Sequence, residues 1–389
     1  MDVTANSSFL RFFSELPDPR GVNIIHKLPD IIVIAVMAVI CGADGWAEVA
    51  YFGQCKNEWL KTFLELPGGI PSHDTFGRVF ALLNPDAFER CFVAWMSTLV
   101  ELSGGRLVAI DGKSIRRSFE HAWDKSGMSH MVSALINQGD NRIVFGQIAV
   151  SDKSNEITAI PKLLELMDIK GAVVTIDAMG TQREIADKIV AGGGDYVLPV
   201  KDNQPSLHEK VSALMNEAAL GDVDGLKVGY FEQQDESHGR IETRRTWVVN
   251  DTVHLGKPLL KLWPGLASGS LAMIERERKD LGDLTGKTTV ERCCYVSSLK
   301  GCDNAAAKLI AQYVRGHWAV ENNLHWQLDV SFREDERRIR KGHGAENYSR
   351  LSRIALNLLK REKSIKAGIK GKRLGAGWDH DYLLKLIST

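Results

Sequence analysis

Hydrophobic residues recur at helical spacing through the first hundred positions of the chain. The run Ile31–Ala43 is almost wholly apolar, and Trp46–Leu64 carries apolar residues three and four positions apart. A Pro- and Gly-rich break follows, and the stretch Ser72–Leu83 then resumes the helical pattern, with Ser72 or Asp74 placed to cap it. The pattern predicts a helical N-terminal domain.

Short β-branched runs replace this pattern after Gly104 and Gly105. The resulting element order, β-β-β-α-β-α-β, is that of the ribonuclease H-like fold, an α/β fold with a mixed sheet whose first and fourth strands are neighbours. The predicted strands are Leu107–Ile110, His130–Ile136, Ile143–Ser151, a run ending at Asp177, and Asp195–Val200, and the predicted helices are 157–167 and 181–191.

Strand-like runs separated by Gly- and Asp-rich turns dominate between Lys201 and Lys300, at 227–233, 240–250, 271–278 and 288–297. A helical pattern resumes near Asn304 and runs past Glu321. The sequence therefore predicts a ribonuclease H-like core interrupted by a mostly β insertion. The predicted segments are the N-terminal helical domain at 1–103, the first part of the core at 104–200, the insertion at 201–300, and the helical C-terminal region at 301–389.

Two of the predicted strands end on an aspartate that a small-residue turn follows. Asp111 ends the first strand and Asp177 ends the fourth. Because these strands are neighbours in the predicted order, we expect the two carboxylates to lie side by side. Carboxylate oxygens are the ligands that hard divalent cations prefer. The pair therefore predicts a divalent-metal site.

A third acid is expected on the helix that follows the insertion. His317, Glu321 and His325 are spaced by four residues, so they form a polar stripe on one face of that helix. Glu321 is the preferred third ligand, and Asp329 and Glu334 remain alternatives. The three residues of the stripe are also an alternative Zn²⁺ site, although that spacing is sterically awkward.

Charge along the chain is balanced overall but not locally. Forty-nine Lys and Arg oppose forty-nine Asp and Glu, so the total charge demands neither nucleic acid nor a membrane. Between Arg333 and Arg373, however, fourteen Lys and Arg stand against five Asp and Glu, which predicts a surface for a polyanion. The Ser72–Leu83 helix is an alternative DNA reader of the helix-turn-helix type, but its single cation, Arg78, favours a packing role.

The six cysteines form no CxxC pair, and Cys293 and Cys294 are adjacent, which is typical of reduced thiols. The N-terminus lacks a signal-peptide pattern, and the Ile31–Ala43 run is too short to cross a bilayer. With 44% hydrophobic residues the chain has ample material for buried cores. These features predict a cytoplasmic protein with no membrane contact.

Several motifs together resemble those of a DDE transposase of the IS4-like superfamily. The closer resemblance is to the ISAs1-type transposases, which include the H-repeat-associated proteins, and it covers nearly the whole chain. The residues that carry it are Ala109–Arg116, Thr175–Gln182, Lys201–Gln204, His238–Glu242 and His317–Asp335, with Asp18–Arg20 and Ile70–Phe76 in the N-terminal region.

The resemblance implies an enzyme that binds the terminal inverted repeats of its element and target DNA, and that cleaves and transfers strands as a homodimer. Two Mg²⁺ or Mn²⁺ ions would be held by Asp111, Asp177 and Glu321, with Asp111 bridging both ions. The same resemblance and the local cationic character imply a set of DNA-binding residues, namely Lys113, Arg116, Arg117, Lys201, Arg240, His317, His325 and Arg333.

The chain departs from the wider IS4-like signature Tyr-x2-Arg-x3-Glu-x6-Lys on the glutamate helix. Val314, His317 and Leu328 stand at the Tyr, Arg and Lys positions, so His317, a pH-sensitive cation, replaces a permanent one. Two alternative functions share the same acids: a ribonuclease H-like nuclease that cuts without joining, and a catalytically decayed relative that binds DNA.

Overall fold

The computed structural model describes residues 8–22, 24–100, 105–118, 129–138, 141–150, 156–221, 225–237, 239–250, 252–281 and 288–388. The chain forms two compact units. Unit 1 contains residues 1–101, 112–167 and 320–389, and unit 2 contains residues 102–111 and 168–319. Both units therefore include segments that are distant in sequence. The boundaries of the four predicted segments stay a prediction, because they rest on the sequence pattern, whereas the two units rest on spatial contacts.

Unit 1 is mainly helical. Ser72 caps α6 as predicted, with its Oγ accepting a hydrogen bond from the Thr75 amide at 3.2 Å. The helices are α2 (Ser8–Phe13), α3 (Leu28–Ile40), α4 (Trp46–Cys55), α5 (Asn57–Leu60), α6 (His73–Leu82), α7 (Pro85–Leu99), α8 (Glu156–Glu165), α13 (Gly344–Arg361), α14 (Ile369–Trp378) and α15 (His380–Ser388), with the 3-10 turn η7 (Glu334–Glu336) and the π-helical turns η5 (Glu321–His325) and η6 (Gln327–Ser331).

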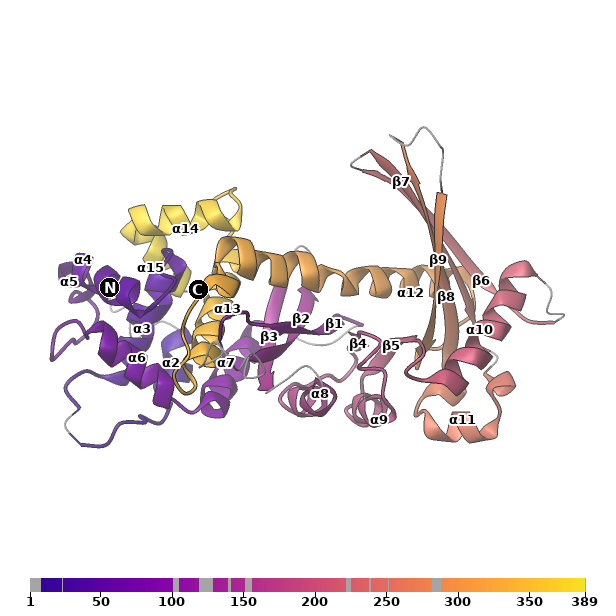
Figure 1. Ribbon diagram of the computed structural model, residues 1–389, viewed down its shortest axis with the longest axis horizontal. Helices are drawn as coiled ribbons and strands as arrows, with labels where there is room; N and C mark the ends of the chain where they lie inside the picture. The colour runs from indigo at the N-terminus through magenta and orange to yellow at the C-terminus, as the bar shows by residue number, and fades with distance from the viewer. Residues whose placement is uncertain are drawn as a thin grey trace. The chain divides into compact units, whose positions relative to one another are not determined.

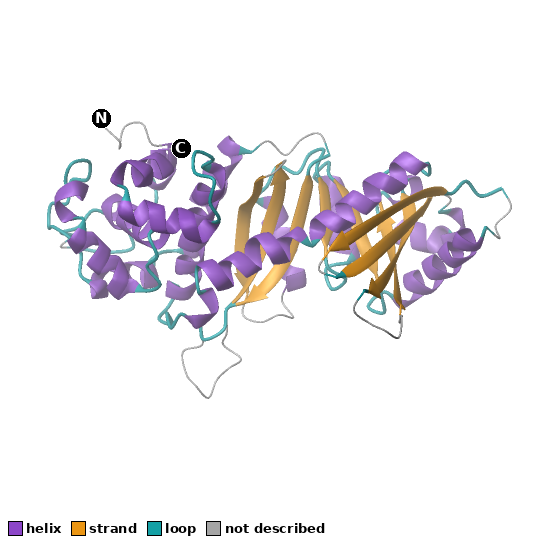
Figure 2. Cartoon of the chain, turned by 90° about the horizontal axis from the view of Figure 1, so that it is seen from above, coloured by secondary structure: helices purple, strands orange, loops and turns teal. Residues whose placement is uncertain are grey.

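Helix α13 is the centre of unit 1. Leu351, Ile354 and Leu358 are buried on it, and it packs against α3, α6 and α7 from the N-terminal region and against α14 and α15. Its polar side chains are buried too, and Asn347 donates to the carbonyls of Phe80 and Leu83. The helices at the two ends of the chain thus share one core (Figure 2).

Two strands of unit 1, β2 (His130–Gln138) and β3 (Asn141–Val150), form an antiparallel hairpin with a register shift between Ala134 and Leu135. The end of β1 (Leu107–Ser114) runs beside β2, since the Ile115 amide donates to the Ser129 carbonyl at 2.9 Å. Within unit 1 the strand order is therefore β3-β2-β1.

Unit 2 carries the rest of the sheet in the order β1-β4-β5-β9-β8-β7-β6. The β1–β4 and β4–β5 pairs are parallel, and the remaining pairs are antiparallel, so the sheet is mixed as predicted. The strands are β4 (Val173–Ile176), β5 (Asp195–Val200), β6 (Gly229–Ser237), β7 (Arg240–Val249), β8 (Ser270–Asp280) and β9 (Thr288–Ser297).

Helices cover both faces of the unit 2 sheet (Figure 1). On one face, Ala307, Ile310 and Tyr313 of α12 pack on side chains of the sheet that include Leu107 and Val173. A Cβ on Gly316 would approach the Leu107 side chain to 2.3 Å, so this glycine permits the close packing. The helices of unit 2 are α9 (Arg183–Ala191), α10 (Pro205–Leu220), α11 (Lys257–Leu262) and α12 (Asn304–His317), with 3-10 turns η3 (Val253–Leu255) and η4 (Leu266–Ser268).

The predicted α/β class is confirmed, and β1 and β4 are neighbours as expected. The more specific ribonuclease H-like assignment stays a prediction. The predicted insertion is less purely β than expected, because the 16-residue helix α10 and the short α11 lie within it. In the part of the chain that the structure describes, no helix is both long enough and apolar enough to traverse a membrane.

The outer halves of β6 to β9 are held by rows of alternating charges rather than by a core. Glu232, Arg245, Glu275 and Arg292 are consecutive partners in the register of the four strands. Arg245 contacts Glu232 at 3.0 Å and Glu275 at 2.9 Å, and Arg292 contacts Glu275 at 2.8 Å. Such a connected row stabilises more than isolated exposed ion pairs do.

Candidate active site

Asp111 and Asp177 occupy matching positions along neighbouring parallel strands. Ile110 of β1 pairs with Ile176 of β4. Asp177 directly follows β4, whereas Asp111 lies within β1, which continues to Ser114 and does not end at Asp111 as predicted. Adjacent strands lie about 4.8 Å apart, so the two half-buried aspartates follow the sheet side by side. The structure therefore brings together the two predicted acids of unit 2.

Both aspartates continue the row of side chains that faces α12. Leu107 and Val173 belong to the core beneath α12, and side chains alternate between the faces of a strand. Thr175 lies on that same face, and its Oγ1 is 3.0 Å from Nδ1 of His317 at the end of α12. The last turn of α12 is thus fixed over the strand that carries Asp177.

A network of hydrogen bonds shapes the turn after Asp177. The Gly180 amide donates to Asp177 Oδ1 at 2.9 Å, which orients the carboxylate. Asn203 donates to the carbonyl of Ala178 at 2.7 Å, and Gln204 donates to that of Thr181 at 3.1 Å. The Lys201–Gln204 motif therefore supports the acidic turn from the neighbouring strand β5.

The third predicted acid, Glu321, opens the π-helical turn η5. Its side chain is exposed, and it makes no hydrogen bond or ion pair with the described part of the chain. Both alternative acids are engaged. Asp329 forms an ion pair with Lys113 at 2.7 Å, and buried Glu334 accepts from Arg353 at 2.9 Å. Within unit 1, Glu321 is thus the candidate whose carboxylate is available.

The two histidines of the predicted stripe are electrically neutral at neutral pH. Burial lowers the pKa of His317 to about 4. Burial, aided by the charges of Arg353 and Lys113, lowers the pKa of His325 to about 3. Neither ring then supplies the positive charge that a phosphate contact requires. His317 instead serves as a neutral hydrogen-bond partner of Thr175.

Among the described residues, no group of three or more His, Cys, Asp and Glu side chains is assembled closely enough to hold a metal ion. Asp111 and Asp177 nevertheless supply the hard oxygen donors that Mg²⁺ and Mn²⁺ prefer, and no soft ligand stands at either strand end. The residues fit a hard divalent cation better than Zn²⁺.

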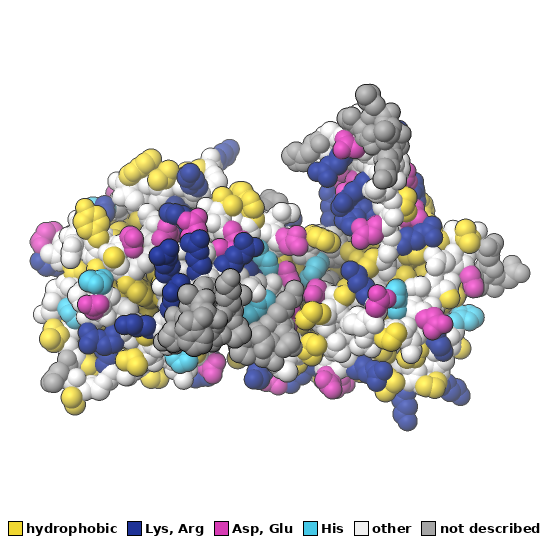
Figure 3. All heavy atoms as spheres, in the orientation of Figure 1, with side chains coloured by type: hydrophobic (Ala, Val, Ile, Leu, Met, Phe, Trp, Pro, Cys, Tyr) yellow, Lys and Arg dark blue, Asp and Glu magenta, His cyan; other side chains and the backbone are white. Residues whose placement is uncertain are grey.

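The predicted phosphate contacts of unit 1 fall into two kinds. Lys113 is only 9% exposed and is held by carboxylates. Arg116 is 79% exposed, with its Nε 3.4 Å from Asp335. Arg117 is exposed as well, and its carbonyl accepts from Arg340 at 3.2 Å, which gathers these arginines together. Figure 3 shows Lys and Arg side chains grouped on the face of unit 1 that it presents.

Arg333 is the remaining predicted contact in unit 1. It is exposed, has a left-handed backbone with φ 51°, and contacts Asp44 and Glu336. In unit 2, Arg240 is exposed at the start of β7, while its motif neighbour His238 lies outside the described residues. These arginines remain candidate DNA contacts.

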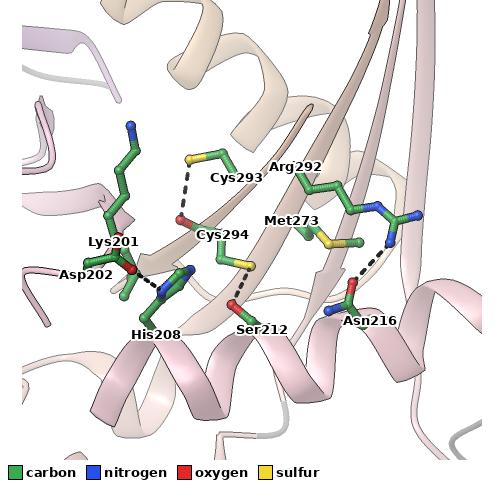
Figure 4. Close-up of a pocket in the computed structure, with 10 residues that line it drawn as sticks. Lys201, Asp202, His208, Ser212, Asn216, Met273, Arg292, Cys293 and Cys294 are labelled. Atoms are coloured by element: carbon green, nitrogen blue, oxygen red, sulfur yellow. Dashed lines mark hydrogen bonds and ion pairs between the residues drawn. The ribbon is translucent and has the colours of Figure 1, made fainter. Parts of the chain in front are cut away.

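Lys201, the last predicted contact, is exposed at the end of β5 beside a cavity of about 430 Å³. Figure 4 shows the cavity between α10 and strands β8 and β9, with the Lys201 ammonium directed away from Ser212. Arg292 in the lining is oriented by Asn216 at 3.2 Å and by Glu275. Arg292 is therefore matched by neighbouring polar groups, whereas the Lys201 ammonium points away from Ser212.

The predicted basic surface between Arg333 and Arg373 is partly an interior. Five of its fourteen cations are buried, and each donates to a backbone carbonyl or a buried carboxylate. The five are Arg337, Arg350, Arg353, Lys372 and Arg373. Only the exposed remainder is available to a polyanion.

Sequence reasoning missed a buried polar group that lies against Gly112. Ser114 Oγ lies 2.8 Å from Nδ1 of His130, and the other ring nitrogen makes a short hydrogen bond to Glu156. A Cβ on Gly112 would come within 2.5 Å of both His130 and Glu156. The motif Asp-Gly-Lys-Ser contained this signal, since only glycine fits against the pair.

Comparison with known families matches nearly the whole chain. The family model described as "Transposase DDE domain" matches residues 102–358, and the one described as "DDE_Tnp_1-associated" matches residues 10–96. The first range contains all three candidate acids. The second corresponds to the predicted N-terminal helical domain.

Two similar proteins come from Escherichia coli. YncI of E. coli O157:H7, provisionally named a transposase, is 41% identical over 383 residues, which are 98% of this chain and 95% of that one. YhhI of strain K12, provisionally named an H repeat-associated transposase, is 36% identical over 387 residues, 97% of each chain. The solved piggyBac transposase synaptic complex with hairpin DNA is 9% identical, covers 97% of this chain and 77% of that one, and has a TM-score of 0.40, from which we draw nothing.

Proposed function

This chain belongs to the family that the transposase DDE domain defines, and from that membership we propose that it cleaves the ends of a mobile DNA element and joins them to target DNA. The observation that carries the proposal is the register of β1 and β4, which sets Asp111 and Asp177 side by side on the face beneath α12. A pair of carboxylates so placed is suited to phosphodiester chemistry.

We assign the third acid to Glu321. It follows His317 by four positions in the sequence, and it lies within the range that the transposase DDE family model matches. Glu321 also begins a π-helical turn, a rare element that is frequent at functional sites. Its exposed carboxylate contrasts with the engaged carboxylates of Asp329 and Glu334.

Together, Asp111, Asp177 and Glu321 would hold Mg²⁺ or Mn²⁺. Two such ions, when bound, activate the attacking oxygen and stabilise the leaving oxygen of a phosphodiester. The chain itself orients the acids. Asp177 is held by the Gly180 amide, and the turn behind it is braced by Asn203 and Gln204.

Exposed arginines are the best candidates for gripping DNA phosphates in this proposal. Arg116, Arg117 and Arg333 serve this role in unit 1, and Lys201 and Arg240 serve it in unit 2. The neutral His317 and His325 are assigned to shaping the glutamate helix instead. Each phosphate contact steepens the salt dependence of DNA binding by about one unit of the log–log slope.

The test is a cleavage and joining assay with Mg²⁺ or Mn²⁺ on duplexes that carry the terminal inverted repeats flanking the gene. We expect Asp111→Asn, Asp177→Asn and Glu321→Gln each to reduce cleavage by at least about 10³-fold, the scale on which loss of an essential catalytic group acts. Asp187→Asn, which alters an exposed acid on α9, is the matched control and should cut normally.

Three other results would contradict the proposed function or its assigned acids. Undiminished cleavage by Asp111→Asn would refute the assignment of the acids. Cleavage by the unaltered protein without any joined product would identify a nuclease. Specific binding without cleavage in either metal would identify a catalytically decayed relative.

A further inference from the structure

The side chain of Lys113 is built into the interior of unit 1. Its Nζ lies 2.7 Å from Asp329 Oδ1 and 3.0 Å from Asp335 Oδ1, and the residue is 9% exposed. Lys113 is therefore a buried side chain held by two carboxylates.

Its partners belong to the segment that carries Glu321. Asp329 lies in η6, the second of two π-helical turns, and Glu321 opens the first, η5. Asp335 lies in the following turn η7, where its Oδ1 also accepts from the Arg116 amide at 3.2 Å. Lys113 thus ties the end of β1, two residues beyond Asp111, to the segment that follows Glu321.

The other face of the same strand is fixed as well. Gly112 rests directly on the hydrogen-bonded pair of His130 and Glu156, and Ser114 binds the His130 ring at 2.8 Å. Buried pairs of this kind contribute little net stability but tolerate few arrangements, since a lost partner leaves a buried polar group unsatisfied. The part of β1 that follows Asp111 is therefore held by contacts on both of its faces.

We propose that Lys113 is a positioning residue, which holds the end of β1 (residues 112–114) against the π-helical turns of unit 1, and not a phosphate ligand. The proposal rests on the function proposed above. A phosphate that approached the Lys113 ammonium would meet the carboxylates of Asp329 and Asp335. The exposed neighbour Arg116 is free of that obstacle over most of its surface.

The two roles predict opposite results for Lys113→Met. A positioning role leaves DNA affinity and its salt slope unchanged but lowers the single-turnover cleavage rate about 100-fold, the cost of a displacement near 1 Å. It also raises the Mn²⁺ concentration needed for half-maximal cleavage. A phosphate role instead weakens binding and reduces the salt slope by about one. Arg116→Met is the comparison variant, for which we expect the second pattern.

Asp329→Asn and Asp335→Asn decide the matter independently. If Lys113 positions the end of β1, each variant resembles Lys113→Met in rate while DNA affinity stays the same, and Lys113→Arg recovers part of the rate. If Lys113 binds phosphate, removing either carboxylate tightens DNA binding and leaves the rate intact, which overturns the proposal. Should Lys113→Met fail to fold, these isosteric variants still give the answer.

The unaltered protein separates this inference from the proposed function. If it neither cuts nor joins DNA, the proposed function fails. If it cuts and Lys113→Met cuts equally well with equal metal dependence, the positioning role alone fails.

Discussion

Two half-buried histidines, His317 and His325, make the stability of the fold depend on pH in acid. The folded pKa of His317 is about 4 and that of His325 about 3, whereas an unfolded histidine titrates near 6.5. Between these values the unfolded chain binds protons that the folded chain does not. The free energy of unfolding therefore falls as the pH drops below about 6.5, by up to about 1.4 kcal/mol per pH unit for each ring.

Replacing His317 with Asn should flatten this dependence between pH 6.5 and 4. Denaturant unfolding at a series of pH values measures the slope, and His73→Asn, which changes an exposed ring, is the control. An unchanged slope in His317→Asn would show that this ring is protonated in the folded protein.

Arg353 and Glu334 form the most completely buried ion pair of the described residues, and they make a second prediction at this scale. Although burial opposes the charge of Glu334, Arg353 and other nearby cations lower its pKa to about 2. Arg353→Met leaves that carboxylate without its main partner, so we expect a loss of about 3–5 kcal/mol in the free energy of unfolding.

The double variant Arg353→Met with Glu334→Met is the control for that loss. It removes both charges, so most of the stability should return. If the double variant is as unstable as Arg353→Met, packing rather than the unpaired charge is the cause.

At the residue scale, the sequence placed the two aspartates on neighbouring strands better than it placed their surroundings. The positions of Asp111 and Asp177 could be predicted because each follows a β-branched run directly, a local signal, while their role as metal ligands stays a proposal. The neutrality of His317 and the engagement of Lys113 could not, since both depend on partners 142 and more than 200 residues away. Burial and distant partners, not residue type, decide which cations are exposed.

At the scale of elements, β-branched runs located the strands closely, and β5 and β9 begin and end at the predicted residues. Helix α10 was missed although its signals are present. Pro205 occupies its first turn, Gly221 ends it in the left-handed conformation, and Leu207 and Val211 are buried four positions apart. The strand-like runs after these helix signals dominate the pattern of residues 201–300, so the sequence predicted a mostly β insertion there.

The π-helical turns η5 and η6 were not predictable from periodicity. An extra residue per turn shifts every later side chain around the helix, and that shift decides which residues reach the interior. Asp329, an alternative third acid in the sequence, forms an ion pair with Lys113. Tertiary contacts, which a local pattern does not contain, select this geometry.

At the scale of the whole molecule, the segments matched by two separate family models do not correspond to separate cores. The N-terminal helices of unit 1 complete their hydrogen bonding with the C-terminal ones. Arg373 donates to the Val39 carbonyl at 3.0 Å, and Tyr348 donates to that of Ala43 at 2.9 Å. Exposed carbonyls and apolar faces would remain if either segment were removed.

Residues 1–101 should therefore not fold alone. In the full chain, α13 covers α3 and α6, and Asn347 satisfies two backbone carbonyls at the end of α6. A fragment of residues 1–101 loses this cover, so we expect helix without cooperative thermal unfolding when circular dichroism is measured, whereas the full chain should unfold cooperatively. Arg373→Met in the full chain is a milder test of the same contact. It should lower the free energy of unfolding by about 1–3 kcal/mol, because it leaves buried carbonyls unsatisfied. A sharp unfolding transition of the fragment, at the temperature of the full chain, would show that the N-terminal segment is an independent domain and that α13 merely rests against it.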